Sequence, residues 1–122
     1  MDAGMKAKPI LIVDDEPDIC EALEMALTME GYAVKAIQDR QNALTAIADD
    51  EPGMIFLDYR MPGLEIADFL GALKSAKVEC PIVLMTGNKD PQDQARDLGL
   101  EHHLQKPFEL DAMVALVRKL SC

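Results

Sequence analysis

Short apolar segments alternate with helical patterns along the whole chain. Three segments are continuously apolar, which is typical of strands buried on both faces of a sheet: Ile10–Val13, Met54–Leu57 and Ile82–Met85. Two more segments contain polar residues and are predicted to be strands near the sheet edges: Ala33–Ile37 and His102–Leu104. The pattern therefore predicts five strands.

Helices are predicted between these strands because apolar residues recur there at three- and four-residue spacing. The first begins at Pro17, a favourable first helical residue, and stops before Gly31. The others include residues 43–48, 66–73, 91–98 and 110–117, of which 91–98 is mostly polar and is expected to be the most loosely held. Five successive strand–helix units predict one α/β domain, a doubly wound (βα)5 fold with a parallel sheet and helices on both faces.

Polar residues stand where the predicted strands end, namely Asp14 and Asp15, Asp58, Thr86 and Lys106. Because the carboxyl ends of parallel strands meet at one edge of the sheet, we expect these side chains to converge. Three carboxylates in one place repel one another, and a hard cation such as Mg²⁺ relieves that repulsion. For any one acid alone, capping the following helix is the more ordinary role, and Asp15 is a candidate for it.

Composition narrows the classes of function. The 122 residues and 13.4 kDa suit a single domain. Acidic residues outnumber basic ones 22 to 12, and the formal net charge of −10 argues against direct nucleic-acid binding and against docking on anionic membranes. No apolar run approaches the ~20 residues of a membrane helix. The three cysteines are far apart and indicate reduced thiols and a cytoplasmic location: Cys20, Cys80 and Cys122.

Four motifs at the strand ends resemble those of the receiver domain of two-component response regulators. They are Ile12-Val13-Asp14-Asp15, Leu57-Asp58-Tyr59-Arg60-Met61-Pro62-Gly63, Met85-Thr86-Gly87 and Lys106-Pro107-Phe108. Each motif is weak alone, but their order and placement are specific, and the resemblance covers about residues 8–120. It implies a flavodoxin-like sheet with strand order 2-1-3-4-5, a flexible tail over residues 1–8 and a receiver domain over residues 9–122.

The resemblance also implies roles for the clustered acids. Asp58 aligns with the phosphoacceptor, which receives a phosphoryl group from a phosphohistidine on a sensor histidine kinase or a histidine phosphotransfer protein. Asp15 and Asp58 align with direct ligands of Mg²⁺ or Mn²⁺. Asp14 aligns with an acid that holds a metal-bound water, and Arg60 with a ligand through its backbone carbonyl. A domain of this kind catalyses only its own phosphorylation and dephosphorylation.

A switch is implied on the other side of the site. Lys106 is expected to place a cation beside the phosphoryl group, and Thr86 to offer it a hydroxyl, which would move the surface formed by the fourth and fifth strand–helix units. His103 stands where the family usually has a Tyr or Phe switch, and a partly exposed histidine on an edge strand is the equal alternative. That surface is also the predicted contact for an output domain, a downstream protein or a second copy of the chain.

Two positions invite comparison with the family pattern. Ile66 stands where the family usually has glycine, so the start of the third helix is expected to differ, because a β-branched residue disfavours positive φ. The bond between Lys106 and Pro107 is often cis in the family, and proline makes that isomer accessible.

Three alternative functions remain to be weighed. An aspartate-nucleophile phosphohydrolase of haloacid dehalogenase type needs an Asp-x-Asp pair, and Arg60 occupies the second position. A flavodoxin-type flavin module needs a phosphate loop after the first strand, where Asp14, Asp15 and Glu16 would repel a phosphate. A degenerate receiver that serves only in protein contacts stays open because of His103 and Ile66.

The negative charge is unevenly distributed. Residues 1–61 hold 13 acids and 5 bases, a net of −8, whereas residues 62–122 hold 9 and 7, a net of −2. The first predicted helix contributes several acids without a basic residue of its own: Asp18, Glu21, Glu24 and Glu30. A solvated face is the ordinary interpretation, and a docking face for a phosphodonor with a basic rim is the sharper one.

Overall fold

The structure, a computed structural model, describes residues 8–121 and consists of alternating strands and helices. The strands are β1 (Ile10–Val13), β2 (Val34–Ile37), β3 (Met54–Asp58), β4 (Ile82–Thr86) and β5 (His102–Gln105). The helices are α1 (Pro17–Met29), α2 (Arg40–Asp49), α3 (Ile66–Ser75), α4 (Pro91–Asp97) and α5 (Leu110–Leu120). The predicted succession of elements is confirmed, with differences of a few residues at their ends.

All five strands form one parallel sheet in the order β2-β1-β3-β4-β5, as predicted. The apolar strands β1, β3 and β4 occupy the centre, and the more polar β2 and β5 lie at the edges. In the register between neighbours, Val13 lies beside Leu57 and Asp58 lies beside Met85. The carboxyl ends of the three central strands therefore meet at one edge of the sheet.

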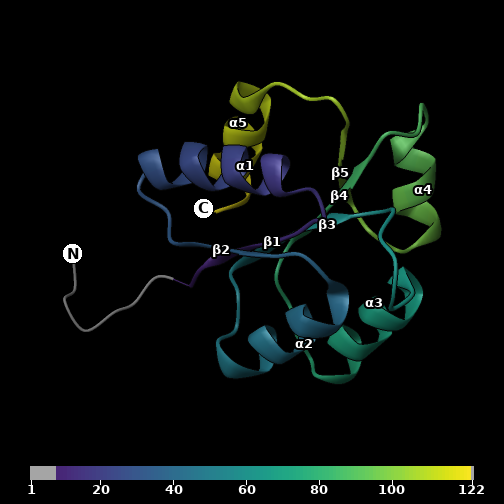
Figure 1. The fold of residues 1–122 in the computed structure, drawn as a ribbon. Helices are drawn as coiled ribbons and strands as arrows, with labels where there is room; N and C mark the ends of the chain where they lie inside the picture. Colours follow the sequence, from purple (N-terminus) through teal and green to yellow (C-terminus); the bar gives the residue numbers. More distant parts are fainter. Residues whose placement is uncertain (1–7, 122) are drawn as a thin grey trace.

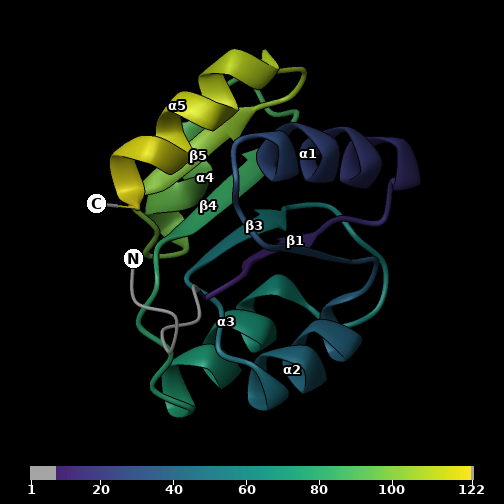
Figure 2. The ribbon, with the colours of Figure 1, turned by 90° about the vertical axis from the view of Figure 1, so that its left-hand side faces the viewer.

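Helices cover both faces of the sheet (Figures 1 and 2). On one face, α1 and α5 bury a cluster that includes Leu23, Phe56 and Met113. On the other face, α2 and α3 bury a second cluster that includes Ile47 and Phe69. Alternate residues of β1 and β3 point to opposite clusters, which explains why these strands need to be apolar at every position.

The α4 helix contributes least to the apolar core, because none of its residues belongs to either of the two core clusters. It is the shortest helix among residues 8–121, packs against β4 and β5, and buries only Pro91 and Ala95. The loop before it, residues 87–90, is exposed throughout. Few apolar contacts hold this segment, as its polar sequence predicts.

The start of the described chain and the loop before α3 complete the description of the fold. Residues 1–7 of the predicted flexible tail lie outside the described part of the chain, and Lys8 forms an exposed ion pair with Glu51 at 3.8 Å. Ile66 is the first residue of α3, and the positive φ of the loop before it falls on Gly63, at 94°. Within the described range, no helix is long and apolar enough to cross a membrane.

Candidate functional site

Three carboxylates meet at the carboxyl edge of the sheet, as the strand ends predict. Asp14 and Asp15 follow β1, and Asp58 is the last residue of β3. Carboxylate oxygens of the three lie within 4.8 Å of one another, and they form the only group of three potential metal ligands found in residues 8–121. Asp14 and Asp58 are buried, at 0% and 4% exposure, whereas Asp15 is more accessible.

Asp14 is held by the surrounding chain on both carboxylate oxygens. Its Oδ1 accepts a hydrogen bond of 2.9 Å from the backbone N–H of Glu16, and its Oδ2 accepts one of 2.8 Å from Lys106 Nζ. Asp15 does not cap α1, because the N-cap position belongs to Glu16, and no side chain caps that helix. The capping interpretation of Asp15 is therefore wrong.

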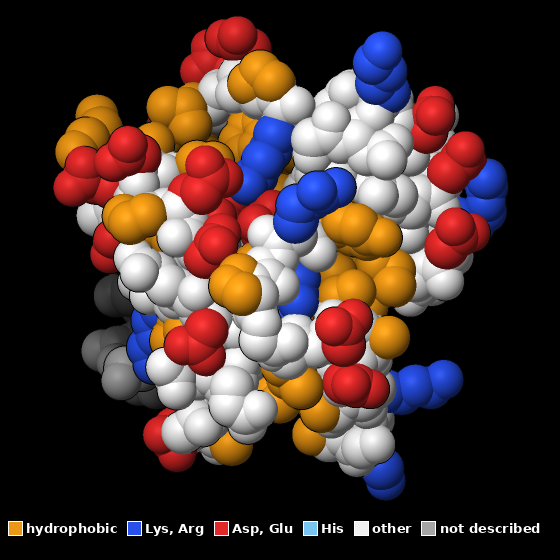
Figure 3. All heavy atoms as spheres, turned by 45° about the vertical axis from the view of Figure 1, so that its right-hand side comes forward, with side chains coloured by type: hydrophobic (Ala, Val, Ile, Leu, Met, Phe, Trp, Pro, Cys, Tyr) orange, Lys and Arg blue, Asp and Glu red, His pale blue; other side chains and the backbone are white. Residues whose placement is uncertain are grey.

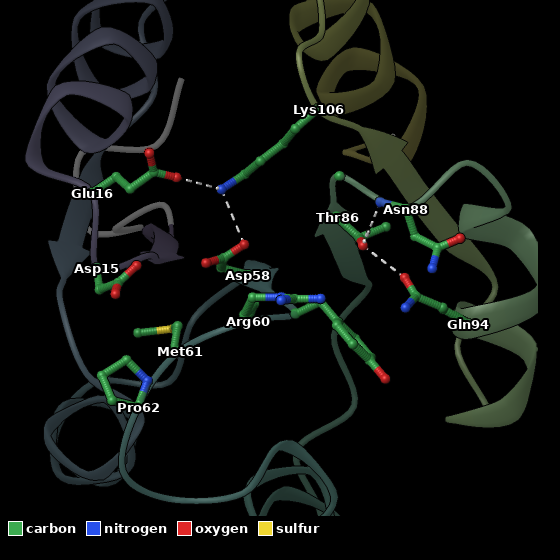
Figure 4. A pocket seen from close by; sticks show the side chains of 12 residues that line it. Asp15, Glu16, Asp58, Arg60, Met61, Pro62, Thr86, Asn88, Gln94 and Lys106 are labelled. Atoms are coloured by element: carbon green, nitrogen blue, oxygen red, sulfur yellow. Dashed lines mark hydrogen bonds and ion pairs between the residues drawn. The ribbon is translucent and has the colours of Figure 1, made fainter.

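Lys106 is the cation at the centre of the site. Its Nζ lies 2.8 Å from Asp14 Oδ2, 3.0 Å from Asp58 Oδ1 and 3.1 Å from Glu16 Oε1. Figure 4 shows the side chain reaching from the β5–α5 connection toward Asp58 and Glu16. Burial opposes its charge, but hydrogen bonds with Asp14 and Asp58 outweigh burial and raise the pKa of Lys106. The bond to Pro107 is cis.

Asp58 combines burial with a single cationic partner. Burial raises the pKa of its carboxyl group, although the hydrogen bond with Lys106 acts in the opposite direction, and neighbouring Asp14 raises it further. Asp58 Oδ1 faces Lys106, and Oδ2 has no donor among residues 8–121. The carboxylate therefore has one oxygen that is anchored and one that is available.

Thr86 ends β4 on the far side of the site. Its Oγ1 donates to Oε1 of Gln94 in α4 at 2.6 Å and accepts from the backbone N–H of Asn88 at 3.1 Å. Figure 4 shows this hydroxyl directed toward Asn88 and Gln94. The structure thus brings Thr86 to the edge of the site but ties its hydroxyl to α4.

An open cleft of about 640 Å³ lies over these groups. Its lining includes Asp15, Asp58, Arg60, Thr86 and Lys106. Figure 3 shows acidic side chains crowded at the upper left of this face, with Lys and Arg side chains in and around the hollow. Asp58 lines this cleft, so its carboxylate can be reached from solvent there.

His103 lies two strands away from Asp58, with β4 between them. It is half-buried in β5, where its register partner is Leu84 of β4. Adjacent His102 is 3.9 Å from Glu101, and neither histidine belongs to the acidic cluster. The switch role of His103 stays a prediction.

Sequence reasoning missed Arg40, Glu16 and Gln94. Arg40 is the first residue of α2 and only 2% exposed, and its guanidinium binds backbone carbonyls of the β3–α3 loop. A signal was present, because Arg40 precedes Ala43 by three residues and Ile47 by seven, which places it on the buried stripe of its helix. No comparable pattern marks Glu16 or Gln94.

The donor set suits a hard divalent cation. The carboxylate of Asp15 has no hydrogen bond or ion pair with any described residue, and Asp58 keeps one oxygen available. The four carboxylates of Asp14, Asp15, Glu16 and Asp58 and the ammonium of Lys106, which contacts all of them except Asp15, sum to a formal charge of −3. Oxygen ligands and excess negative charge are what Mg²⁺ and Mn²⁺ sites use.

Comparison with known proteins agrees with this geometry. The sequence model of the family described as response regulator receiver domain matches residues 10–118. The chain belongs to the receiver domain family. Receiver domains are signalling domains of two-component systems and generally bind Mg²⁺ at an acidic pocket.

Relatives extend the comparison in sequence and in structure. The response regulator MprA of Mycolicibacterium vanbaalenii is 34% identical over 113 residues, which are 91% of this chain and 49% of MprA. The receiver domain of NtrX from Brucella abortus is 30% identical, with a TM-score of 0.82 over 92% of this chain and 97% of that domain. The chemotaxis protein CheY4 of Vibrio cholerae has a TM-score of 0.83 at 22% identity, covering 94% and 99%, and shows the shared fold. This receiver chain spans about half the length of the first curated relatives that it matches.

Proposed function

We propose that this receiver is a phosphoacceptor that takes a phosphoryl group from a phosphohistidine onto Asp58. The observation that carries the proposal is the carboxylate of Asp58, anchored through Oδ1 by Lys106 at 3.0 Å and open to the cleft through its other oxygen. A carboxylate oxygen attacks phosphorus, the phosphorus–nitrogen bond breaks, and the imidazole nitrogen leaves with the electron pair and takes up a proton. The product is an aspartyl phosphate.

Lys106 and Thr86 serve this reaction from two sides. Lys106 Nζ has three donors, and all three face carboxylates, so it can keep Asp14 and Asp58 and release the exposed Glu16 to donate to a phosphoryl oxygen. Thr86 can offer its hydroxyl to another phosphoryl oxygen only when it releases Gln94 of α4. Phosphorylation is therefore expected to displace the loop that leads to α4, a helix whose described residues belong to neither core cluster.

Asp15, Asp58 and the backbone carbonyl of Arg60 would hold Mg²⁺ or Mn²⁺, and Asp14 would bind a water of that ion. Among described residues, no hydrogen bond occupies the Asp15 carboxylate or the Arg60 carbonyl, which supports their assignment as ligands. When bound, the ion screens negative charge on the carboxylates and on the transferring phosphoryl group. Its two positive charges would leave one of the three excess negative charges.

The proposed partners follow from the charges on the surface. The face of α1 presents Asp18, Glu21 and Glu24, whereas Glu30 is paired with Arg118 of α5. A sensor kinase or histidine phosphotransfer protein with a basic rim would suit this face, and its association would weaken with salt.

An output domain, a downstream protein or a second copy would contact the surface formed by β4, α4, β5 and α5. His103 takes part in switching that surface in a cytoplasmic protein.

Intact-mass measurement tests the phosphoacceptor proposal. Wild-type protein incubated with Mg²⁺ and acetyl phosphate is expected to gain one phosphate, and the Asp58→Asn variant to gain none. An unchanged mass in wild type, repeated with a genuine partner kinase, would favour a degenerate receiver that acts only through protein contacts. Equal labelling of the Asn variant would overturn the assignment of Asp58.

A further inference from the structure

Arg40 is a buried cation that lies outside the acidic cluster. It opens α2, whose N-cap Asp39 accepts a 2.7 Å hydrogen bond from the backbone N–H of Asn42. Its side chain leaves the buried stripe of the helix and ends beneath the β3–α3 connection. Burying a guanidinium without a carboxylate partner is costly, so its contacts call for an explanation.

Those contacts are all with backbone carbonyls of one loop. Arg40 Nη2 donates to the carbonyl of Asp58 at 2.9 Å and to that of Tyr59 at 2.8 Å, and Nη1 donates to the carbonyl of Leu64 at 2.7 Å. Hydrogen bonds from a charged donor are stronger than neutral ones, and the planar guanidinium fixes the directions of its donors. Arg40 therefore holds both ends of the loop at residues 59–65.

The loop has little else to hold its backbone. Tyr59 donates its N–H to the carbonyl of Met85, and the carbonyl of Glu65 accepts from Phe69 at the start of α3. Between these two points, residues 60–64 take part in no backbone–backbone hydrogen bond with any residue of the described chain. The side chains of Met61 and Leu64 pack against the core beneath α2 and α3, so this packing and the Arg40 hydrogen bonds on its two sides together place the Arg60 carbonyl.

We propose that Arg40 is a positioning residue that fixes the β3–α3 loop so that the Arg60 carbonyl meets a divalent cation held by Asp15 and Asp58. This inference rests on the proposed function for the binding of the ion by Asp15, Asp58 and the Arg60 carbonyl. The hydrogen bonds from Arg40 to the loop are seen in the structure itself. Groups that orient metal ligands commonly change metal affinity by about 10–100-fold when they are removed.

If Arg40 acted only through its charge, replacing it would change the Mg²⁺ affinity in the opposite direction, so the measured affinity distinguishes the two explanations. A buried positive charge near the carboxylates repels a divalent cation, so removing that charge would tighten cation binding. Loss of a positioning clamp instead loosens the loop and weakens binding. A side chain that served only the stability of the fold would leave the affinity unchanged.

Arg40→Met keeps an unbranched apolar side chain and removes all three hydrogen bonds. We expect this variant to bind Mg²⁺ at least about tenfold more weakly than wild type in isothermal titration calorimetry. We also expect amide hydrogen exchange of residues 59–65 to be faster in the metal-free protein. Arg40→Lys, which keeps the charge and can reach one carbonyl, is expected to fall between the two and provides the test if the Met variant does not fold.

Ile47→Ala is the matched control, because Ile47 is a buried residue of the same helix, seven positions after Arg40, and its side chain has no hydrogen-bonding group to hold the loop backbone. It is expected to lower stability while leaving Mg²⁺ affinity and loop exchange at wild-type values. Unchanged or tighter Mg²⁺ binding in the folded Arg40 variants would overturn the positioning role. If wild type binds Mg²⁺ and the Arg40 variants weaken it, but no phosphorylation occurs, the clamp stands and the phosphoacceptor proposal fails.

Discussion

The two loops that flank Asp58 are held in different ways. The β3–α3 loop is clamped by a buried arginine through three charge-assisted hydrogen bonds to its backbone. The β4–α4 loop is exposed at residues 87–90, and hydrogen bonds involving the side chains of Thr86, Asn88 and Gln94 hold it. Under the proposed function, the Arg60 carbonyl that would bind an ion lies on the clamped side, and the Thr86 hydroxyl that would change its partner lies on the other.

Burial follows the same division. The clamped side rests on α2 and α3 with Phe69 at 0% exposure, whereas α4 on the other side buries only Pro91 and Ala95. A segment with few apolar contacts opens at low free-energy cost. A small change at Thr86 can therefore move α4 without disturbing the carboxylates.

The largest expected effect tests that difference in burial. Phe69→Ala removes a fully buried ring and is expected to lower the free energy of unfolding by about 3–5 kcal/mol. Ala95→Gly in α4 is expected to cost about 1 kcal/mol. Urea denaturation followed by circular dichroism measures both, and equal losses would contradict the division.

Lys106 links separate strands of the site. It follows β5, and its ammonium contacts Asp14, which follows β1, and Asp58, which ends β3. Lys106→Met leaves Asp14 and Asp58 without their cation and is expected to cost about 2 kcal/mol at neutral pH. Lys35→Met removes an exposed ion pair with Asp50 and is expected to cost less than about 1 kcal/mol. The same denaturation measurement compares them, and similar losses would show that the buried pairs add nothing.

The negative charge of Asp58 is expected to lower the free energy of unfolding of the metal-free protein. Burial raises the pKa of Asp58 despite Lys106, so the folded chain keeps this proton to higher pH than the unfolded chain does. Wild type therefore loses stability relative to Asp58→Asn as pH rises above the ordinary aspartate pKa of about 3.9. At pH 7 the variant is expected to be more stable by about 1 kcal/mol, the size of an ordinary substitution effect.

Thermal unfolding in EDTA between pH 3.5 and 7, spanning the ordinary carboxyl pKa range of about 4, measures this difference. Glu79→Gln, at an exposed position, is the matched control for removal of one negative charge. A variant that is less stable than wild type at pH 7 would mean that the Lys106 pair outweighs the burial of Asp58.

The smallest expected effect concerns the movable side. Gln94→Ala removes the partner that holds the Thr86 hydroxyl at 2.6 Å. In this variant the hydrogen bond between Thr86 and Gln94, with a net free energy of about 1 kcal/mol, no longer has to be broken on phosphorylation. At acetyl phosphate concentrations that phosphorylate only a small fraction of wild type, the phosphorylated fraction should therefore rise about fivefold. Phosphate-affinity electrophoresis measures it, with exposed Gln92→Ala as control. A fraction unchanged from wild type would show that Gln94 does not restrain Thr86.

Periodicity in the sequence predicted most of the fold. The apolar segments at residues 10–13, 54–57 and 82–85 are the central strands, because strands covered on both faces need apolar side chains at every position. The acids that follow the first two of these segments were correctly expected to converge, since parallel strands end at one edge. The polar segments became the edge strands and α4 for the same reason.

Contacts between distant segments are what the pattern of residues did not reveal. Arg40 lies on a stripe that otherwise predicts core, and only the fold shows that its guanidinium meets carbonyls from residues 18 to 24 positions later. Glu16 likewise acquires its partner Lys106 through approach of separate strand–helix units, and Gln94 meets Thr86 because α4 folds back over the end of β4.

The sequence by itself determined the succession of strands and helices, the central position of three strands and the carboxylates at the ends of two of them. Local periodicity and strand polarity are sufficient for these, because they depend on burial of each element. Only the tertiary structure decided that Asp14 is held by Lys106, that Thr86 is tied to Gln94 and that the loop after Asp58 is clamped from below. Directional hydrogen bonds depend on how side chains from different elements meet in three dimensions.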